Sequence, residues 1–131
     1  MEWYLKVMRD NYSNFSGRAR RQEYWMFSLF YLIFTIAAFI IVALVGGLLS
    51  VAAGETVGYV IAGLLFIVFF LAHFIPSLAV TIRRIHDTGN SGWLYLLVLI
   101  PYLGSLIIFI FTVIDGQKKE NKWGPDPKLD A

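Results

Sequence analysis

Residues 83–93 read RRIHDTGNSGW, and this stretch decides how the chain must fold. It holds four ionisable side chains, yet apolar sequence runs up to it at Ile82 and leaves it again at Leu94. The glycines, asparagine and serine in its second half are typical of a tight connection between helices. We therefore expect a polar hairpin that joins two apolar segments where they meet water.

The composition of the whole chain indicates a membrane protein. Its 131 residues are 58% hydrophobic and only 15% charged, and the mean hydropathy is +0.66. A soluble domain is nearer to half apolar and a quarter charged. The length allows one domain, so residues 1–131 are treated as a single integral membrane domain. The sequence has no cysteine, which excludes disulfides, thiolate metal sites and a cysteine nucleophile.

Three apolar segments are long enough to cross a bilayer. No charged residue occurs from Tyr24 to Ala53, and this run of 30 residues exceeds the roughly 20 needed to span the hydrocarbon core. We predict three membrane-spanning helices, over residues 24–49, 57–82 and 93–114. The third contains Pro101 and Gly104, which predict a kink near Pro101. A re-entrant segment that turns back there is the alternative.

The two ends of the chain are expected to lie outside the hydrocarbon core. Residues 2–15 predict an amphipathic helix whose apolar face holds Trp3, Tyr4, Val7, Met8, Tyr12 and Phe15. Such a helix lies in the headgroup plane; packing on the protein's own surface is the alternative. Residues 115–131 form a polar tail, whose prolines argue against a helix. The fold class is therefore an all-α membrane protein with one interfacial helix and three membrane-spanning helices.

The distribution of positive charge predicts the orientation of the chain. All eleven Lys and Arg lie in residues 6–21, in the pair Arg83 and Arg84, or in residues 118–128. Three spans with the N-terminus in the cytoplasm place seven of these charges inside and four outside. A re-entrant third segment would place all eleven inside. We expect a multi-pass protein with a cytoplasmic N-terminus.

A polar stripe descends from the hairpin into the second span. It shares one helical face and consists of His73, Ser77, Thr81 and Arg84. Pro76 leaves a carbonyl one turn earlier, near Ala72, without its helical partner. The stripe either lines a transport path in an oligomer or holds helices together. In the second case a neutral His73 would bond to a neighbouring hydroxyl, such as that of Tyr31, Thr35 or Tyr102.

The basic side chains suggest a binding function, since guanidinium groups at a bilayer boundary suit phosphates. We predict that the cytoplasmic face binds anionic lipid headgroups or a membrane-protein partner, a second copy of this chain included. The candidate residues are Arg18, Arg20, Arg21, Arg83, Arg84, His86 and Asp87. Asp87 follows Arg83 by four residues, so an ion pair between them is expected. No nucleic-acid partner is expected, because no recognised motif accompanies the charge.

Catalysis is not expected from this sequence. His86 and Asp87 are adjacent, so on a helix their side chains point about 100° apart. The chain has two histidines and no His-x-x-x-His pair, so neither a metal site nor a cofactor is expected. It also lacks the Gly-x-Ser-x-Gly elbow and a phosphate loop. The alternative activity is acid–base modification of a lipid headgroup by His86 and Asp87.

Three motifs in the same order resemble those of a known family. They are GRARRQEYW at residues 17–25, RRIHDTGNSGW at residues 83–93, and Pro101 and Gly104 followed by NKWGPDP at residues 121–127. Together they cover nearly the whole chain. The chain is similar to the bacterial inner-membrane proteins catalogued as domain of unknown function 805. The resemblance implies a small bacterial inner-membrane protein and implies no particular activity.

Overall fold

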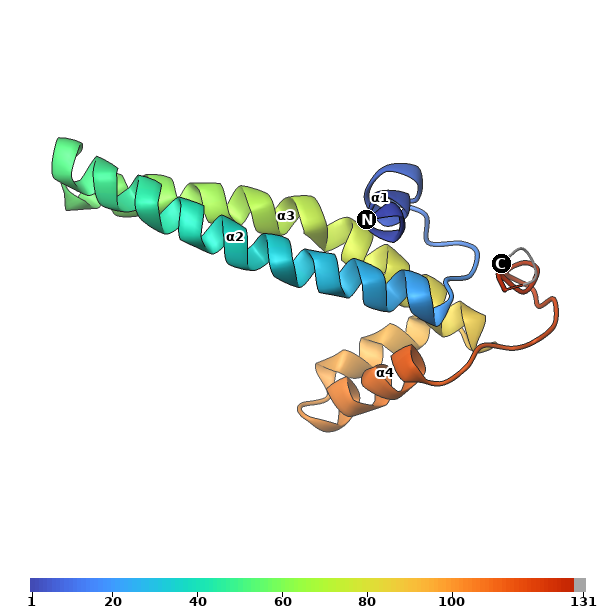
Figure 1. Ribbon diagram of the computed structural model, residues 1–131. Coiled ribbons are helices and arrows are strands. Elements are labelled where there is room, and N and C mark those ends of the chain that lie inside the picture. The colour runs from blue at the N-terminus through green and yellow to red at the C-terminus, as the bar shows by residue number, and fades with distance from the viewer. Residues whose placement is uncertain (129–131) are drawn as a thin grey trace.

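Two long helices form the axis of the molecule. The computed structural model describes residues 1–128, and every regular element in these residues is a helix (Figure 1). Helices α2 (Arg21–Ala53) and α3 (Glu55–Asp87) pair along their length. Gly54 joins them with a φ of 99°, a backbone conformation that glycine adopts at no steric cost.

Both long helices have the length and composition of membrane spans. Each has 33 residues, or about 50 Å at 1.5 Å per residue, against a hydrocarbon core of roughly 30 Å. They contain the predicted spans 24–49 and 57–82 and extend beyond them. Their large apolar side chains point outward, with Phe39 64% and Leu48 72% exposed. This surface suits contact with lipid.

The N-terminal helix packs against the long helix pair (Figure 1). It consists of α1 (Glu2–Leu5) and a π-helical turn, η1 (Lys6–Asp10). Val7 is fully buried, and the ring of Tyr4 stacks on that of Phe27 with centroids 5.7 Å apart. Part of the predicted apolar face, Tyr4, Val7 and Met8, therefore packs on the protein's own surface, which was the alternative to an interfacial helix, whereas Tyr12 and Phe15 stay exposed. The helix also stops short of residue 15.

The third apolar segment differs from the prediction of one kinked helix over residues 93–114. It forms a 3-10 helix, η2 (Gly92–Leu99), and an α-helix, α4 (Leu103–Val113), which lie side by side and antiparallel (Figure 1). The chain reverses at Pro101 and Tyr102, where Tyr102 has a φ of 64°. Each limb is about 16 Å long, roughly half of a hydrocarbon core.

Gly104 explains why the two limbs can lie so close. A Cβ atom at this position would be 1.6 Å from the carbonyl oxygen of Leu97 on the opposite limb. Pro101 contributes as well, because it has no N–H to donate to a continuing helix. The pair of residues that predicted a kink therefore makes a complete reversal of the chain.

We expect Gly104→Ala to destabilise the protein, because the added methyl group would force the two limbs of the hairpin apart. Overpacking of this kind costs about 1–3 kcal/mol, and thermal melting in detergent should occur several degrees lower. Gly63→Ala is the matched control, since a Cβ there meets nothing within 4 Å and alanine is the better helix former. Equal melting of the two variants would contradict the close contact at Gly104.

Candidate functional site

One carboxylate at the end of α3 binds two buried arginines. Oδ1 of Asp87 lies 3.0 Å from Nε of Arg18, and Oδ2 accepts a hydrogen bond from Arg84. Arg18 is 8%, Arg84 0% and Asp87 2% exposed. We call these three residues the Asp87 cluster. Two positive charges face one negative charge, so the cluster needs further acceptors to be stable away from water.

Backbone carbonyls supply those acceptors. Arg84 donates to the carbonyl of Ala19 at 2.9 Å and also to that of Ile114. Arg18 donates to the carbonyls of Lys119, at 2.6 Å, and of Gly124, at 3.2 Å, and to that of Gln117. The Asp87 cluster thus fixes the loop before α2 and the tail after α4 to the end of α3.

The tail also completes the C-terminus of α3, whose last carbonyls have no partner within the helix. The backbone N–H of Gln117 donates to the Asp87 carbonyl at 2.7 Å, and the side-chain amide of Asn121 donates to the His86 carbonyl at 3.0 Å. Residues 114–124 are therefore part of the site, whereas the sequence predicted a polar tail over residues 115–131 without assigning it a partner.

Arg83 has a different partner from the one predicted. Its Nη1 lies 2.6 Å from Oε1 of Glu23 on α2, and both side chains are almost completely buried. The expected pair with Asp87 is wrong, because that carboxylate is bound by Arg84 and Arg18. Arg83 and Arg84 are adjacent, so their side chains diverge by about 100° on the helix. Arg83 therefore faces α2, whereas Arg84 faces Asp87. The Nζ of Lys6 lies 3.7 Å from the other oxygen of Glu23.

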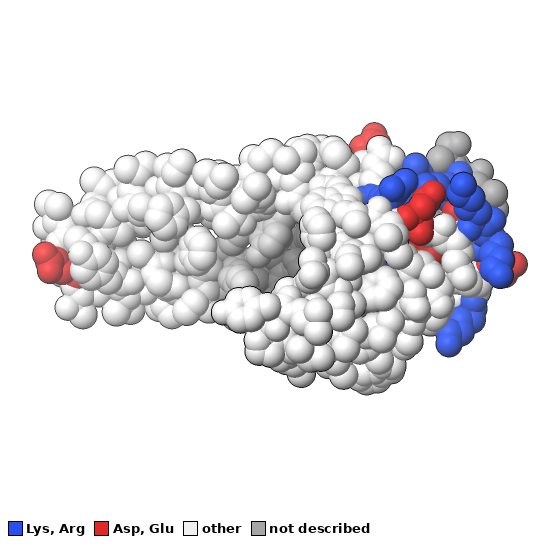
Figure 2. Space-filling model, turned by 90° about the horizontal axis from the view of Figure 1, so that it is seen from below, with Lys and Arg blue, Asp and Glu red and all other residues white. Residues whose placement is uncertain are grey.

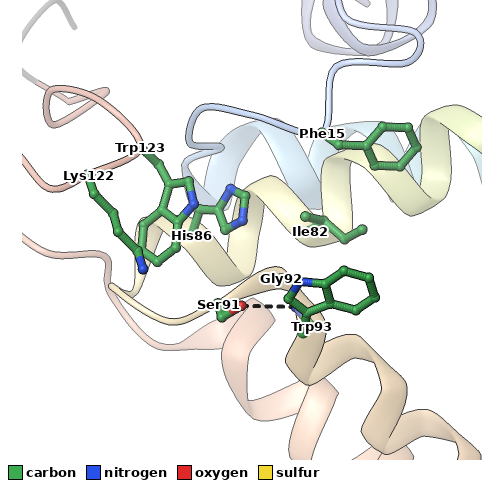
Figure 3. A pocket seen from close by; sticks show the side chains of 8 residues that line it. All are labelled: Phe15, Ile82, His86, Ser91, Gly92, Trp93, Lys122 and Trp123. Atoms are coloured by element: carbon green, nitrogen blue, oxygen red, sulfur yellow. Dashed lines mark hydrogen bonds between the residues drawn. The ribbon is translucent and has the colours of Figure 1, made fainter.

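The side chains of His86 and Asp87 contact different groups. Nδ1 of His86 lies 2.9 Å from the Gly17 carbonyl, so this nitrogen carries the proton. The imidazole stacks on the indole of Trp123, with centroids 4.4 Å apart and planes 8° apart. Its Nε2 faces a cavity of about 340 Å³ between the loop before α2, the end of α3, the start of η2 and the tail (Figure 3).

Residues of the N-terminal segment form hydrogen bonds to the polar stripe on α3. Nε2 of His73 accepts a hydrogen bond of 2.7 Å from the Tyr4 hydroxyl, which was not among the three predicted partners. Tyr12 donates at 2.7 Å to the carbonyl of Ala72, the backbone group that Pro76 leaves without a helical partner. The sequence could not show Tyr4 as a partner, because Tyr4 and His73 are 69 positions apart and only the fold brings them together.

The two middle residues of the stripe, Ser77 and Thr81, differ in their hydrogen bonding. The Thr81 hydroxyl donates to the Ser77 carbonyl at 2.7 Å. The Ser77 hydroxyl is buried and has no partner among residues 1–128. The stripe therefore joins helix α3 to the N-terminal segment at His73 and leads to the Asp87 cluster through Arg84.

We call Arg18, Arg20 and Arg21 the collar arginines, and the last two of them lie closer to the surface than Arg18. The Arg20 guanidinium lies 5.6 Å from the ring centroid of Trp3, and Lys6 Nζ lies 5.3 Å from the same centroid. These side chains line a cavity of about 520 Å³ beside Gly124. Arg21 is exposed and lies 3.7 Å from Asp115.

Asp115 has a second cationic partner in the tail. Its hydrogen bond with Lys128 lowers the pKa of the Asp115 carboxyl, so it stays ionised over the ordinary range of pH. The carboxylate lies at the surface, where such a pair contributes little to stability.

Two important residues were not predicted as part of the site. Glu23 holds Arg83, and Trp123 covers His86. Glu23 carried a usable signal, since it is the one acidic residue between the collar arginines and the apolar run that starts at Tyr24. Trp123 carried no such signal apart from its place in the motif at residues 121–127.

We expect Arg84→Ala and Asp87→Ala to destabilise the protein by similar amounts. Asp87→Ala leaves Arg18 and Arg84 without their carboxylate, and Arg84→Ala removes one of the two cations that bind Asp87. Breaking a buried ion pair typically costs about 3–5 kcal/mol. Thermal melting in detergent measures the loss. Arg9→Ala is the control, because Arg9 is exposed and pairs only with its exposed neighbour Asp10. Wild-type melting of both cluster variants would show that the cluster does not hold the fold together.

Comparison with known proteins agrees with the architecture and the motifs. The family model described as protein of unknown function (DUF805) matches residues 12–125. The chain is 45% identical over 130 residues to inner membrane protein YhaH of Escherichia coli (strain K12), covering 99% of each chain. It is 42% identical over 133 residues to inner membrane protein YhaI of the same strain, covering 98% of each. No solved structure matches the chain significantly. The chain therefore belongs to the DUF805 family.

Proposed function

We propose that this is a multi-pass protein of the bacterial inner membrane that binds anionic lipid headgroups without catalysis. Helices α2 and α3 cross the bilayer, and both ends of the chain lie in the cytoplasm. The hairpin of η2 and α4 enters the cytoplasmic leaflet and returns. The relatives named as inner membrane proteins support the location.

The gathering of cations supports the orientation. All eleven Lys and Arg lie in η1, the loop before α2, the first residue of α2, the end of α3 or the tail. The contacts of Arg18 join the loop, the end of α3 and the tail, and Lys6 of η1 lies 3.7 Å from Glu23 near the start of α2. Figure 2 shows blue side chains at this end of the molecule and red atoms at the opposite end. The turn between the long helices lies at Gly54, and acidic Glu55 follows it. Positively charged segments stay in the cytoplasm.

The hairpin of η2 and α4 supports two crossings over the predicted three. Its limbs are too short to span the core singly, and they return the chain to the end at which they began. Trp93 is 79% and Leu99 77% exposed, so apolar side chains cover the outside of the hairpin. A hairpin of this kind, with backbone groups bonded within it, can lie in one leaflet.

The proposal of lipid binding depends on which cations are buried and which remain at the surface. Arg18 and Arg84 are occupied by a carboxylate and by carbonyls, and Arg83 is buried against Glu23, so none of the three is offered to a ligand at the surface. The cations that remain at the surface surround this end, and they include Lys6, Arg20, Lys118, Lys119 and Lys122. Clusters of this sign next to a membrane attract the anionic cytoplasmic leaflet.

The alternative of an oligomeric transporter has less support. A transport path along His73, Ser77 and Thr81 would need polar groups open to water. The Tyr4 hydroxyl occupies the outward nitrogen of His73, and Thr81 bonds to its own helix. These contacts favour a structural role for the stripe.

Single cysteines test the orientation, because the natural chain has none. A membrane-impermeant maleimide added to intact cells with a permeabilised outer membrane should label Glu55→Cys and leave Lys118→Cys unlabelled. Both should react after the inner membrane is broken. Asp10→Cys is the control for a cytoplasmic position, because the N-terminal segment lies in the cytoplasm whether the chain crosses the membrane two or three times. It should stay unlabelled in intact cells. Labelling of Lys118→Cys in intact cells would restore the three-span prediction.

Lipid retention tests the binding function. Protein purified in mild detergent and mixed with equal amounts of phosphatidylglycerol and phosphatidylcholine should retain the anionic lipid preferentially, as counted by native mass spectrometry. Arg20→Gln together with Lys6→Gln should reduce this preference severalfold, because charges near an anionic surface contribute about 1 kcal/mol each.

The control for this experiment is Arg9→Gln, which removes an exposed charge of the same helical segment outside the cavity. It should leave the preference near that of the wild-type protein. Equal retention of both lipids by the wild-type protein would overturn the proposal.

A further inference from the structure

The cavity beside His86 has a polar wall and an apolar wall. His86, Ser91 and Lys122 form the polar wall, and Phe15, Ile82 and Trp93 provide apolar surface (Figure 3). The cavity, of about 340 Å³, lies where the start of the η2–α4 hairpin meets the end of α3. A ligand that fits it must combine a polar head with an apolar body.

The polar wall contains a hydrogen-bond acceptor that the protein does not use. Nδ1 of His86 is committed to the Gly17 carbonyl, so Nε2 of the neutral ring is an acceptor. No donor among residues 1–128 bonds to this nitrogen. Gly92 keeps it accessible, because a Cβ there would lie 3.0 Å from Nε2 and 2.5 Å from Cγ2 of Ile82.

The same wall also carries donors suited to a phosphate. Lys122 is held with its Nζ 4.6 Å from the ring centroid of Trp123, the residue that stacks on His86. The Ser91 oxygen accepts the backbone N–H of Trp93 at 3.3 Å, and its hydroxyl hydrogen remains free to donate. An ammonium group and a hydroxyl can together bind an anionic oxygen.

We propose that this cavity binds an anionic phospholipid whose headgroup bears a hydroxyl, the chemistry of phosphatidylglycerol. Lys122 and Ser91 bind the phosphate, and Nε2 of His86 accepts a hydrogen bond from the headgroup hydroxyl. The acyl portion lies against Trp93 and Phe15. The assignment rests on the proposed function, because it needs this end of the protein to face an anionic leaflet.

The charge around His86 favours a neutral donor over an ammonium headgroup. Lys122 places a positive charge near this wall, because its Nζ lies 4.6 Å from the ring centroid of Trp123, which stacks on His86. An ethanolamine headgroup would bring a second positive charge to this wall, whereas a glycerol hydroxyl brings none. The cavity therefore distinguishes headgroups by hydrogen bonding as well as by net charge.

Two lipids of equal charge test the hydroxyl contact. Phosphatidylmethanol is a phosphodiester with the same single negative charge as phosphatidylglycerol, and it has no headgroup hydroxyl. Detergent-purified full-length protein, assayed by native mass spectrometry against equal mixtures, should retain phosphatidylglycerol about three- to tenfold over phosphatidylmethanol, the range expected for one hydrogen bond. It should retain both over phosphatidylethanolamine.

Three variants assign the contacts. His86→Asn keeps a donor near the position of Nδ1 and removes the acceptor at Nε2, so it should abolish the preference for phosphatidylglycerol over phosphatidylmethanol. Lys122→Gln should weaken retention of both anionic lipids and leave their ratio unchanged. Arg9→Gln makes the same change of charge on an exposed residue outside the cavity, and it should change neither quantity.

Equal retention of phosphatidylglycerol and phosphatidylmethanol by the wild-type protein would overturn the inference, even if His86→Asn failed to fold. An unchanged preference in a folded His86→Asn would overturn it as well, as would retention of phosphatidylethanolamine equal to that of phosphatidylglycerol. The proposed function fails by a different result, since it requires only that anionic lipids be retained over phosphatidylcholine.

Discussion

The sharing of one Asp87 carboxylate between two buried guanidinium groups is the constraint on which the cytoplasmic end depends. One negative charge cannot balance Arg18 and Arg84, and burying the excess charge without further acceptors would be costly. Backbone carbonyls provide those acceptors, and they come from the loop before α2 and from the tail after α4. Segments from both ends of the chain are therefore required to complete the surroundings of Asp87.

The long helices could be predicted from composition, whereas the partners of the polar residues could not. Apolar runs over residues 24–49 and 57–82 fall within α2 and α3. The spacing rule for helices suggested that Arg83 would pair with Asp87, four positions away. The contact that forms instead joins Arg83 to Glu23, 60 residues earlier. Local periodicity carries no information about such a contact, which depends on how two helices align.

The third apolar segment shows a different limit. Residues 93–114 have the length and composition of a membrane span. The same length and composition are compatible with a hairpin, so they do not distinguish the two. The outcome depends on Pro101, on the absence of a side chain at Gly104, and on where the tail must end. The carbonyls of residues 117, 119 and 124 bond to Arg18, so the segment has to bring the chain back to the end of α3.

The distance along the chain between Arg18 and its acceptors has a consequence for biogenesis. The carbonyls of Gln117, Lys119 and Gly124 lie 99 to 106 residues after Arg18, so the ribosome makes them near the end of synthesis. Until then Arg18 has to remain hydrated beside the emerging first helix, where a positive charge directs insertion. In the proposed orientation, one arginine first guides the nascent chain and is desolvated only after translation has supplied the tail.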